Sequence, residues 1–196
     1  MDKISRSEFT GSDMGFDGFF PQYIRELSQR HWTPFSVVLE AASFLAQGGG
    51  RVLDIGSGIG KFCLLAAHHY PAATFCGVEQ REELVELAIL AKDHYKIENA
   101  DFIPGNFKDL SFDPYDHFYF YNSFFENLDE TDAIDSELEY SSSLYTLYSN
   151  LLLKQLGAKP SGTRLATFDV NVSQIPGSYK LAKISKSTSL KMWIRQ

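Results

Sequence analysis

Arg51-Val52-Leu53-Asp54-Ile55-Gly56-Ser57-Gly58-Ile59-Gly60 is the stretch that decides the fold of this chain. An apolar run, interrupted by Asp54, passes through three alternate glycines into a segment with apolar residues at helical spacing. This pattern predicts a strand, a tight turn and a helix. Glycine suits the turn because some positions need positive φ and because the backbone can approach a ligand without a Cβ in the way. The stretch therefore predicts a ligand-binding loop at the carboxyl end of a strand.

Strand-like and helix-like segments alternate around this turn. We expect strands at 51–55, 73–79, 101–103, 117–122 and 163–170, with helices between them. Thr33-Pro34 predicts the start of a helix before the turn, with Thr33 as its N-cap, and the glycines at 48–50 predict its end. Two further strands, 179–185 and 190–195, have no helix between them and so form an antiparallel hairpin. The sequence predicts an α/β, Rossmann-like, doubly wound sheet of seven strands with an antiparallel last strand.

Composition narrows the class of protein. The chain has 196 residues and a net charge of −7, and it contains no run of Lys or Arg, which disfavours nucleic acid as the main partner. No apolar run reaches the ~20 residues that span a bilayer. Two cysteines in apolar segments and no N-terminal apolar stretch predict a cytoplasmic protein. We expect a tail and helical cap over residues 1–47, of which 1–15 form a mobile tail or a lid, and a main domain over 48–196. The oligomeric state is not predicted.

The spacing of the glycines separates several nucleotide-binding classes. A dinucleotide fingerprint needs its third glycine at position 61, which is Lys61, so a nicotinamide-dependent oxidoreductase is disfavoured. A P-loop needs a hydroxyl after that lysine, and Phe62 has none. Glu79 ends the second strand about 19 residues after the turn, where its carboxylate can accept hydrogen bonds from both hydroxyls of a ribose.

Val52 to Gly60 resembles the glycine motif of the class I S-adenosylmethionine-dependent methyltransferases, and the resemblance extends over about residues 33 to 196. It implies S-adenosyl-L-methionine as the cofactor and no metal. It also implies which residues hold that cofactor: Thr33 and Asp54 at the methionine end, Gly56, Ser57, Gly58 and Gly60 along the turn, Glu79 on the ribose, and Gln80, Asn106 and Phe107 at the adenine. Asn106 stands where the family usually has an aspartate.

The end of the fourth strand, Tyr121 to Asn127, is the place where the resemblance puts the methyl acceptor. Asn122 and Phe125 match the Asn/Asp-Pro-Pro-Tyr/Phe motif of enzymes that methylate amino groups, but both prolines are missing. The glycine turn, Gly77-Val78-Glu79 and Asn122-Ser123-Phe124 also resemble the non-SET-domain lysine methyltransferases. The resemblance implies a nitrogen acceptor, a protein lysine or a small amine, with Asn122 as a cofactor contact and as the residue that orients the acceptor lone pair.

Acidic residues follow this strand end. Glu126 is the expected local acid or base, and the carboxylates from Glu126 to Glu139 either guide a cationic acceptor or form a solvated connection. Nearby aromatic residues are expected as core or as walls of a pocket. Because the prolines are missing, a sensor or partner subunit that binds S-adenosylmethionine without catalysis remains the alternative to a methyltransferase.

Overall fold

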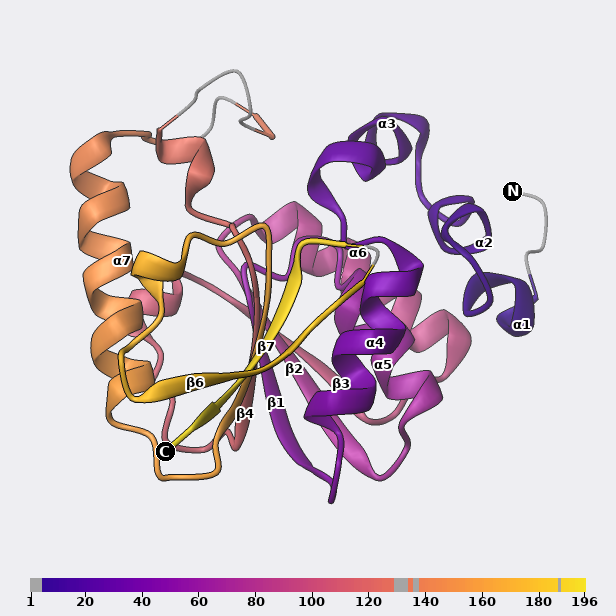
Figure 1. Cartoon of the computed structure of the whole chain (residues 1–196). Helices are drawn as coiled ribbons and strands as arrows, with labels where there is room; N and C mark the ends of the chain where they lie inside the picture. The colour runs from indigo at the N-terminus through magenta and orange to yellow at the C-terminus, as the bar shows by residue number, and fades with distance from the viewer. Residues whose placement is uncertain (1–4, 129–133, 136–137, 187) are drawn as a thin grey trace.

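The computed structural model describes residues 5–128, 134–135, 138–186 and 188–196, which include a seven-stranded sheet (Figure 1). The order of the strands is β3-β2-β1-β4-β5-β7-β6. Their bounds are β1 Gly50–Ile55, β2 Ala73–Glu79, β3 Ala100–Pro104, β4 His117–Tyr121, β5 Arg164–Phe168, β6 Tyr179–Ile184 and β7 Leu190–Arg195.

The pairing of the strands confirms the predicted sheet. β1 pairs in parallel with β2 and β4, β2 with β3, and β4 with β5. β7 is antiparallel to both of its neighbours, β5 and β6, and lies between them. Parallel strands end at the same edge of a sheet, so the carboxyl ends of β1, β2, β3 and β4 lie together. The glycine turn after β1 is therefore at the edge where ligands bind in open α/β sheets.

Helices cover both faces of the sheet, as Figure 1 shows. One hydrophobic cluster joins one face to α4 (Phe35–Leu45), α5 (Lys61–His69) and α6 (Glu82–Tyr95). A second cluster joins the opposite face to α7 (Ser142–Gly157). Side chains of β4 alternate between the clusters, with Tyr119 in the first and Phe118 and Phe120 in the second, as the period of a strand requires. No helix in the described part of the chain has the length and apolar character needed to cross a bilayer.

The N-terminal segment is helical where a mobile tail was expected. α1 (Arg6–Phe9) and α2 (Asp13–Asp17) precede α3 (Gln22–His31). Phe9 and Phe16 are fully buried in the first cluster, and the ring of Phe9 stacks on Tyr95 at 3.9 Å between centroids. The expectation of a mobile tail is therefore wrong from residue 5 onward. Residues 1–4 lie outside the described part of the chain, and both the lid role and the domain boundary stay predictions.

The start of α4 also differs from the expectation. α4 begins at Phe35, Pro34 is its N-cap residue, and no side chain of its own segment caps it. The Thr33 hydroxyl instead shares a hydrogen bond of 3.0 Å with the Tyr119 hydroxyl, so the N-cap assignment of Thr33 is wrong. Asp13 of α2 accepts a hydrogen bond from the Phe35 N–H at 2.9 Å, which satisfies one of the amides that a helix N-terminus leaves unpaired. The cap comes from another helix.

Candidate cofactor and acceptor site

A cavity of about 290 Å³ opens at the carboxyl ends of β1, β2, β3 and β4. Its volume is close to the lower end of the range for ligand sites, ~300 to 1,000 Å³. The walls come from the α3–α4 link, the glycine turn and the segments that follow β2, β3 and β4. The cavity brings together most of the residues expected at the site: Thr33, Asp54, Gly56, Ser57, Gly58, Glu79, Gln80, Asn106, Phe107, Asn122 and Glu126. That they contact a cofactor remains a prediction.

Gly60 is the expected site residue that does not line this cavity. A Cβ at Gly60 would lie 2.4 Å from the Phe102 ring and 3.0 Å from the Ala88 methyl group. The backbone of Gly60 has φ +74°, and Gly60 is the N-cap residue of α5. The third glycine thus serves the packing of α5 against β3 and α6 and lies behind the cavity wall.

The other two glycines of the turn also have positive φ, +76° at Gly56 and +53° at Gly58. Such values are costly for residues with a Cβ. A Cβ at Gly56 would lie 2.4 Å from Ser123 Oγ, and a Cβ at Gly58 would lie 2.5 Å from Trp32 Cζ3. The sequence predicted that the absent Cβ leaves room for a ligand. In the structure, the atoms nearest to these positions belong to Ser123 and Trp32.

Glu79 is held in a fixed position by two backbone amides. Its Oε2 accepts from the Gly58 N–H at 3.0 Å, and its Oε1 accepts from the Arg81 N–H at 3.0 Å. The side chain is 5% exposed. Because an ionised carboxylate offers about four lone-pair sites, these two bonds leave acceptor capacity for the hydroxyls of a ribose. Glu79 is therefore suited to the role that the sequence gives it.

Ser57 supplies a test of whether the cavity suits a polar ligand. Its Oγ is buried, and it has no hydrogen-bond partner among the described residues. Ser57 lines the cavity. Because a buried hydroxyl without a partner costs free energy, a polar group in the cavity would remove that cost. Together with the Glu79 carboxylate, this hydroxyl makes the residues present compatible with a nucleoside cofactor.

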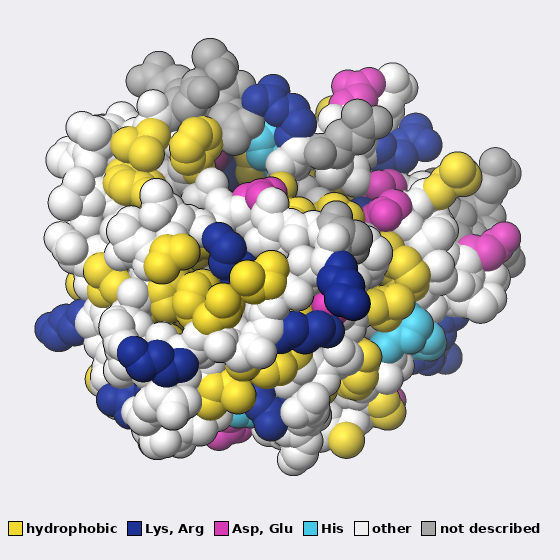
Figure 2. Space-filling model, viewed as in Figure 1, with side chains coloured by type: hydrophobic (Ala, Val, Ile, Leu, Met, Phe, Trp, Pro, Cys, Tyr) yellow, Lys and Arg dark blue, Asp and Glu magenta, His cyan; other side chains and the backbone are white. Residues whose placement is uncertain are grey.

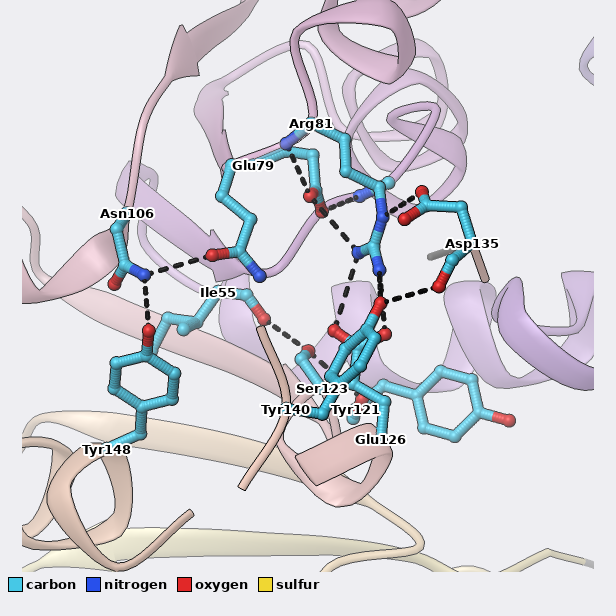
Figure 3. A network of polar contacts seen from close by, with 12 residues as sticks. Ile55, Glu79, Arg81, Asn106, Tyr121, Ser123, Glu126, Asp135, Tyr140 and Tyr148 are labelled. Atoms are coloured by element: carbon cyan, nitrogen blue, oxygen red, sulfur yellow. Dashed lines mark hydrogen bonds and ion pairs between the residues drawn. The ribbon is translucent and has the colours of Figure 1, made fainter. Parts of the chain in front are cut away.

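Arg81 forms the densest polar network of the site, which Figure 3 shows. Its side chain is 6% exposed and contacts four acceptors: Asp135 at 2.7 Å, Glu126 at 2.8 Å, the Tyr140 hydroxyl at 2.8 Å and Glu79 at 3.8 Å. Arg81 is not among the residues that the sequence predicted for the site. The available signal was a basic residue two positions after the ribose carboxylate, upstream of an acidic stretch.

Glu126 lines the cavity, but its carboxylate is paired with Arg81. Burial raises the pKa of Glu126, and the hydrogen bond and charge of Arg81 oppose that rise. Of the acidic stretch, Asp135 is also bound to Arg81, whereas residues 129–133 and 136–137 lie outside the described part of the chain. Glu126 and Asp135 of the acidic stretch are therefore already engaged by a cation.

Asn106 and Phe107 form the corner expected for adenine. The Asn106 amide nitrogen donates to the Tyr148 hydroxyl at 2.8 Å (Figure 3) and to Gln80 Oε1 at 3.0 Å. Its carbonyl oxygen accepts from the Lys108 N–H at 3.1 Å. Phe107 stacks on Phe124 with 4.9 Å between the ring centroids. This corner thus joins the ends of β2 and β3 to α7.

Asn122 lies at the carboxyl end of β4 in a conformation that is uncommon for a residue with a Cβ, with φ +32°. Its backbone carbonyl accepts from the Phe125 N–H at 2.9 Å, and no hydrogen bond of its side chain is recorded among the described residues. The next residue, Ser123, donates to the Ile55 carbonyl at 2.8 Å and so fixes this segment to the glycine turn. Backbone strain of this kind is concentrated at functional sites.

Aromatic side chains from β4 and the segment after it line the cavity, as the sequence predicted. Tyr119 is buried and stacks on Phe62, and Phe124 is buried against Phe107. Tyr121 donates to the Arg30 carbonyl at 3.1 Å, and Phe125 is 38% exposed. Tyr119 and Phe124 are thus walls of the cavity that also belong to the core, whereas Phe125 lies outside both hydrophobic clusters.

Asp54 is a buried carboxyl group beneath the cavity, and burial raises its pKa to about 8. The nearby Glu79 charge adds to the rise, and the Cys63 thiol, 3.7 Å away, opposes it. Between about pH 4 and pH 8 the folded protein then holds a proton that the unfolded chain has lost, so stability falls as pH rises through this window.

Asp54→Asn is expected to remove this fall in stability in the ligand-free protein. Chemical denaturation between about pH 5 and pH 8 should show the free energy of unfolding falling by roughly 2 kcal/mol or more in the parent and staying nearly level in the variant. Asp113→Asn, at an exposed carboxylate, is the matched control and should keep the parent slope. Equal slopes in the parent and Asp54→Asn would show that Asp54 is ionised in the folded state.

Comparisons with known proteins find similarity to methyltransferases. Residues 46–135 match a family described as "Methyltransferase domain". A tRNA (guanine-N(7)-)-methyltransferase from Synechococcus is 44% identical over 54 residues, 28% of this chain and 23% of the relative. A release factor glutamine methyltransferase from Fusobacterium nucleatum is 36% identical over 68 residues, 32% of this chain and 19% of the relative. The matched segments thus span about a quarter or less of these relatives.

Among solved structures, an RNA methyltransferase from Salinibacter ruber in complex with S-adenosyl-L-homocysteine has a similar fold. The TM-score is 0.58 at 19% identity, over 83% of this chain and 92% of the other. The family match contains the glycine turn, Glu79 and Asn122, and the strand order is that of the sheet derived above. Residues 46–135, 90 of the 196 residues, thus match a methyltransferase domain, and the sheet has the fold of the class I S-adenosylmethionine-dependent methyltransferases.

Proposed function

We propose that this chain transfers the methyl group of S-adenosylmethionine to a nitrogen atom. One observation carries the proposal: Ser57, Glu79 and Asn122, which lie on three different segments, line a single cavity at the carboxyl edge of the sheet. When bound, the cofactor supplies a methyl group that the sulfonium already activates, so the protein supplies alignment and control of charge.

Each wall of the cavity has a separate task in this proposal. The Glu79 carboxylate holds the ribose, and the corner of Gln80 and Asn106 receives the adenine. Asn122 accepts a hydrogen bond from the acceptor N–H and thereby directs the nitrogen lone pair at the methyl carbon. The bound cofactor would supply the methyl group by exchange of its S–C bond for an N–C bond, and an acceptor nitrogen that was neutral would carry a positive charge after methylation and release it as a proton. Glu126 is available for that proton only if Arg81 releases it, because the two are paired at 2.8 Å.

Two classes of nitrogen acceptor are proposed. A protein lysine or a small amine follows from the resemblance at Asn122, and a base nitrogen in RNA follows from the names of the tRNA methyltransferases that the chain matches. The carboxylates of the acidic stretch were expected to guide a cationic amine. They support the lysine or amine class less than expected, because Glu126 and Asp135 are paired with Arg81. A binding protein without catalysis remains the alternative, and it predicts cofactor binding with no transfer to either class.

The test is transfer of a labelled methyl group to lysine peptides, small amines and RNA, together with calorimetric titration of the cofactor.

Glu79→Gln is expected to weaken cofactor binding about tenfold to a hundredfold, since charge-assisted hydrogen bonds contribute ~1.5 to 3 kcal/mol. Glu82→Gln, at an exposed carboxylate three residues away, should bind as the parent does. If Glu79→Gln weakens binding by less than about twofold, the ribose assignment is wrong. Binding without transfer to any acceptor would favour the alternative.

A further inference from the structure

Positive charge is concentrated in one part of this acidic chain. Residues 140–196 contain eight Lys or Arg and a single carboxylate, Asp169, whereas residues 1–139 contain the other 24 carboxylates and ten Lys or Arg. The net charge of −7 is therefore an average over two segments of opposite sign. A local basic surface can attract a polyanion even when the whole chain is acidic.

Four of these lysines lie on the hairpin at one end of the sheet. We define the β6 edge face as Lys180, Lys183, Lys186 and Lys191 with the exposed apolar side chains Leu181 and Ile184. The face includes both sides of the edge strand: the register places Lys180 and Lys183 on the α4 side of the sheet, with Met192, and Leu181, Ile184 and Lys191 on the α7 side, with Trp193. Lys180, Lys183 and Lys186 are exposed, and Leu181 and Ile184 are 46% and 52% exposed. Figure 2 shows basic side chains among hydrophobic ones on the side of the molecule where Figure 1 places β6 and β7, with few carboxylates between them.

The β6 edge face is exposed because of how the sheet ends. β5 and β6 are joined by η4 (Val172–Gln174) and irregular segments, with no α-helix between them. β6 pairs only with β7 in the described sheet, so its other edge has backbone groups open to pairing. The pairing of β6 with β7 has a register shift between Leu181 and Lys183. Such irregularities and edge lysines hinder the pairing of a sheet edge with a second copy. The face is thus better suited to an anion than to another strand.

One lysine of the face has a carboxylate partner. Lys183 binds Glu40 at 2.8 Å, so much of its charge is balanced within the protein. Among the described residues, no carboxylate partner is recorded for Lys180, Lys186 or Lys191. The uncompensated charge of the face therefore comes from these three side chains.

The C-terminal end of the face, at Ile184 and Lys186, lies at the edge of the sheet where the cavity opens, whereas Lys180 is near the other end of β6. β6 runs parallel to β5, because both are antiparallel to β7, so the C-terminal end of β6 is at the carboxyl edge. Leu190 of β7 pairs with Phe168 of β5, and the next residue, Asp169, lines the cavity. With neighbouring strands ~4.8 Å apart, the end of β6 is about 10 Å from the end of β5. A strand of linked nucleotides can reach from the face to the cavity.

The cavity itself offers surfaces on which an unpaired base can stack. Tyr121, Phe125 and Tyr148 line it, and Phe125 is 38% exposed. Single-stranded nucleic acids are bound by basic surfaces that track the backbone and by aromatic rings that stack on the bases. Both parts are present here, one on the hairpin and one at the acceptor end of the cavity.

We propose that the β6 edge face binds the phosphate backbone of single-stranded RNA and thereby presents a base nitrogen to the cavity. This inference rests on the proposed nitrogen methyl transfer and selects RNA from its two acceptor classes. Lys180, Lys186 and Lys191 contact phosphates, and Leu181 and Ile184 contact the apolar parts of the nucleotides. Asn122 then meets the acceptor nitrogen of a base stacked at the cavity mouth.

Fluorescence anisotropy with a labelled 20-nucleotide RNA, over a range of salt concentrations, tests the proposal. Lys180→Gln with Lys186→Gln is expected to lower the slope of log affinity against log salt by about 1.4, which is ~25-fold in affinity near 0.1 M salt. The control is Lys92→Gln on α6 with Lys96→Gln at its C-cap, near the opposite end of the sheet; it removes the same formal charge, and Lys92 is paired with Asp101 at 2.7 Å. The control should bind RNA within about twofold of the parent.

Calorimetry with S-adenosylmethionine on the same variants separates this inference from the proposed function. Both pairs of substitutions should leave cofactor affinity unchanged. If the parent binds RNA but not the cofactor, the proposed function is wrong and the RNA-binding face still holds. Equal loss of RNA affinity in both pairs, or tighter binding of the matching DNA, would overturn the RNA face. So would a parent dimer, seen by sedimentation, that the β6 substitutions convert to a monomer.

Discussion

Arg81→Met is expected to lower the free energy of unfolding by about 3 to 5 kcal/mol, because it leaves buried carboxylates without their cation. Arg81 is 6% exposed and binds Glu126, Asp135 and the Tyr140 hydroxyl, with Glu79 3.8 Å away. The substitution is also expected to affect cofactor binding. Without Arg81 the negative charges of Glu79 and Glu126 repel each other across the cavity wall, so cofactor affinity should also fall.

Denaturant unfolding and calorimetry measure these two effects. Arg25→Met, at an exposed arginine on α3, is the control and should change stability by less than about 0.5 kcal/mol. Adding Glu126→Leu to Arg81→Met should restore part of the lost stability, because it removes one of the unpaired charges. A loss below about 1 kcal/mol in Arg81→Met would mean that the network is open to water and contributes as a surface ion pair does.

Gly58→Leu is expected to abolish measurable cofactor binding. The φ of +53° at Gly58 costs a residue with a Cβ about 1 to 2 kcal/mol, and a Cβ there would lie 2.5 Å from the Trp32 ring. That ring cannot move away freely, because Trp32 Nε1 donates to the Ile24 carbonyl at 3.2 Å. Overpacking adds a cost of ~1 to 3 kcal/mol, and relief of the clash pushes either the ring or the turn into the cavity.

Gly48→Leu is the matched control for this change. Gly48 also has positive φ, +88°, but nothing lies within 4 Å of an added Cβ. It should lose about 1 to 2 kcal/mol of stability from backbone strain and keep cofactor affinity within about twofold. Circular dichroism and thermal unfolding establish that Gly58→Leu is folded at the temperature of the titration. Unchanged affinity in folded Gly58→Leu would place the cofactor away from the glycine turn.

The parts of the fold that follow local rules could be predicted from the sequence. Alternating strand and helix patterns gave the sheet, and the hairpin of β6 and β7 followed from the absence of a helix between two apolar runs. The lining of the site was predictable for the same reason, since parallel strands bring their carboxyl ends to one edge. Asp54, Glu79 and Asn122 each lie at or next to such an end.

Contacts between distant segments could not be predicted in this way. The polar N-terminal stretch contains few apolar residues, and only the structure shows that Phe9 and Phe16 are buried. Lys61 was interpreted only as the residue that breaks a glycine pattern, yet it is buried and binds Asp13 at 2.7 Å and Asp17 at 2.9 Å. Such pairs depend on how the helices pack, which local periodicity does not specify.

The net charge of the whole chain hides the local positive charge of its C-terminal part. A net charge of −7 and the absence of a Lys or Arg run disfavoured nucleic acid, but the lysines of β6 and its turn are spaced along a strand and gather only when the hairpin forms. A count over residues 140–196 alone would have shown eight basic residues against one acidic residue. Charge is therefore better counted by segment than over a whole chain.

The place of β7 in the sheet has a consequence for how the protein is made. β7 is the seventh strand in sequence, but it lies between β5 and β6, where Leu190, Met192 and Trp193 are buried. During synthesis the ribosome releases β6 before β7, so β6 has no neighbour in the sheet until residues 190–195 emerge. Domains fold as units when their pieces are present, at ~5 to 20 residues per second of synthesis. This sheet can close only after nearly all of the described chain has been translated, because β6 pairs only with β7 in the described sheet.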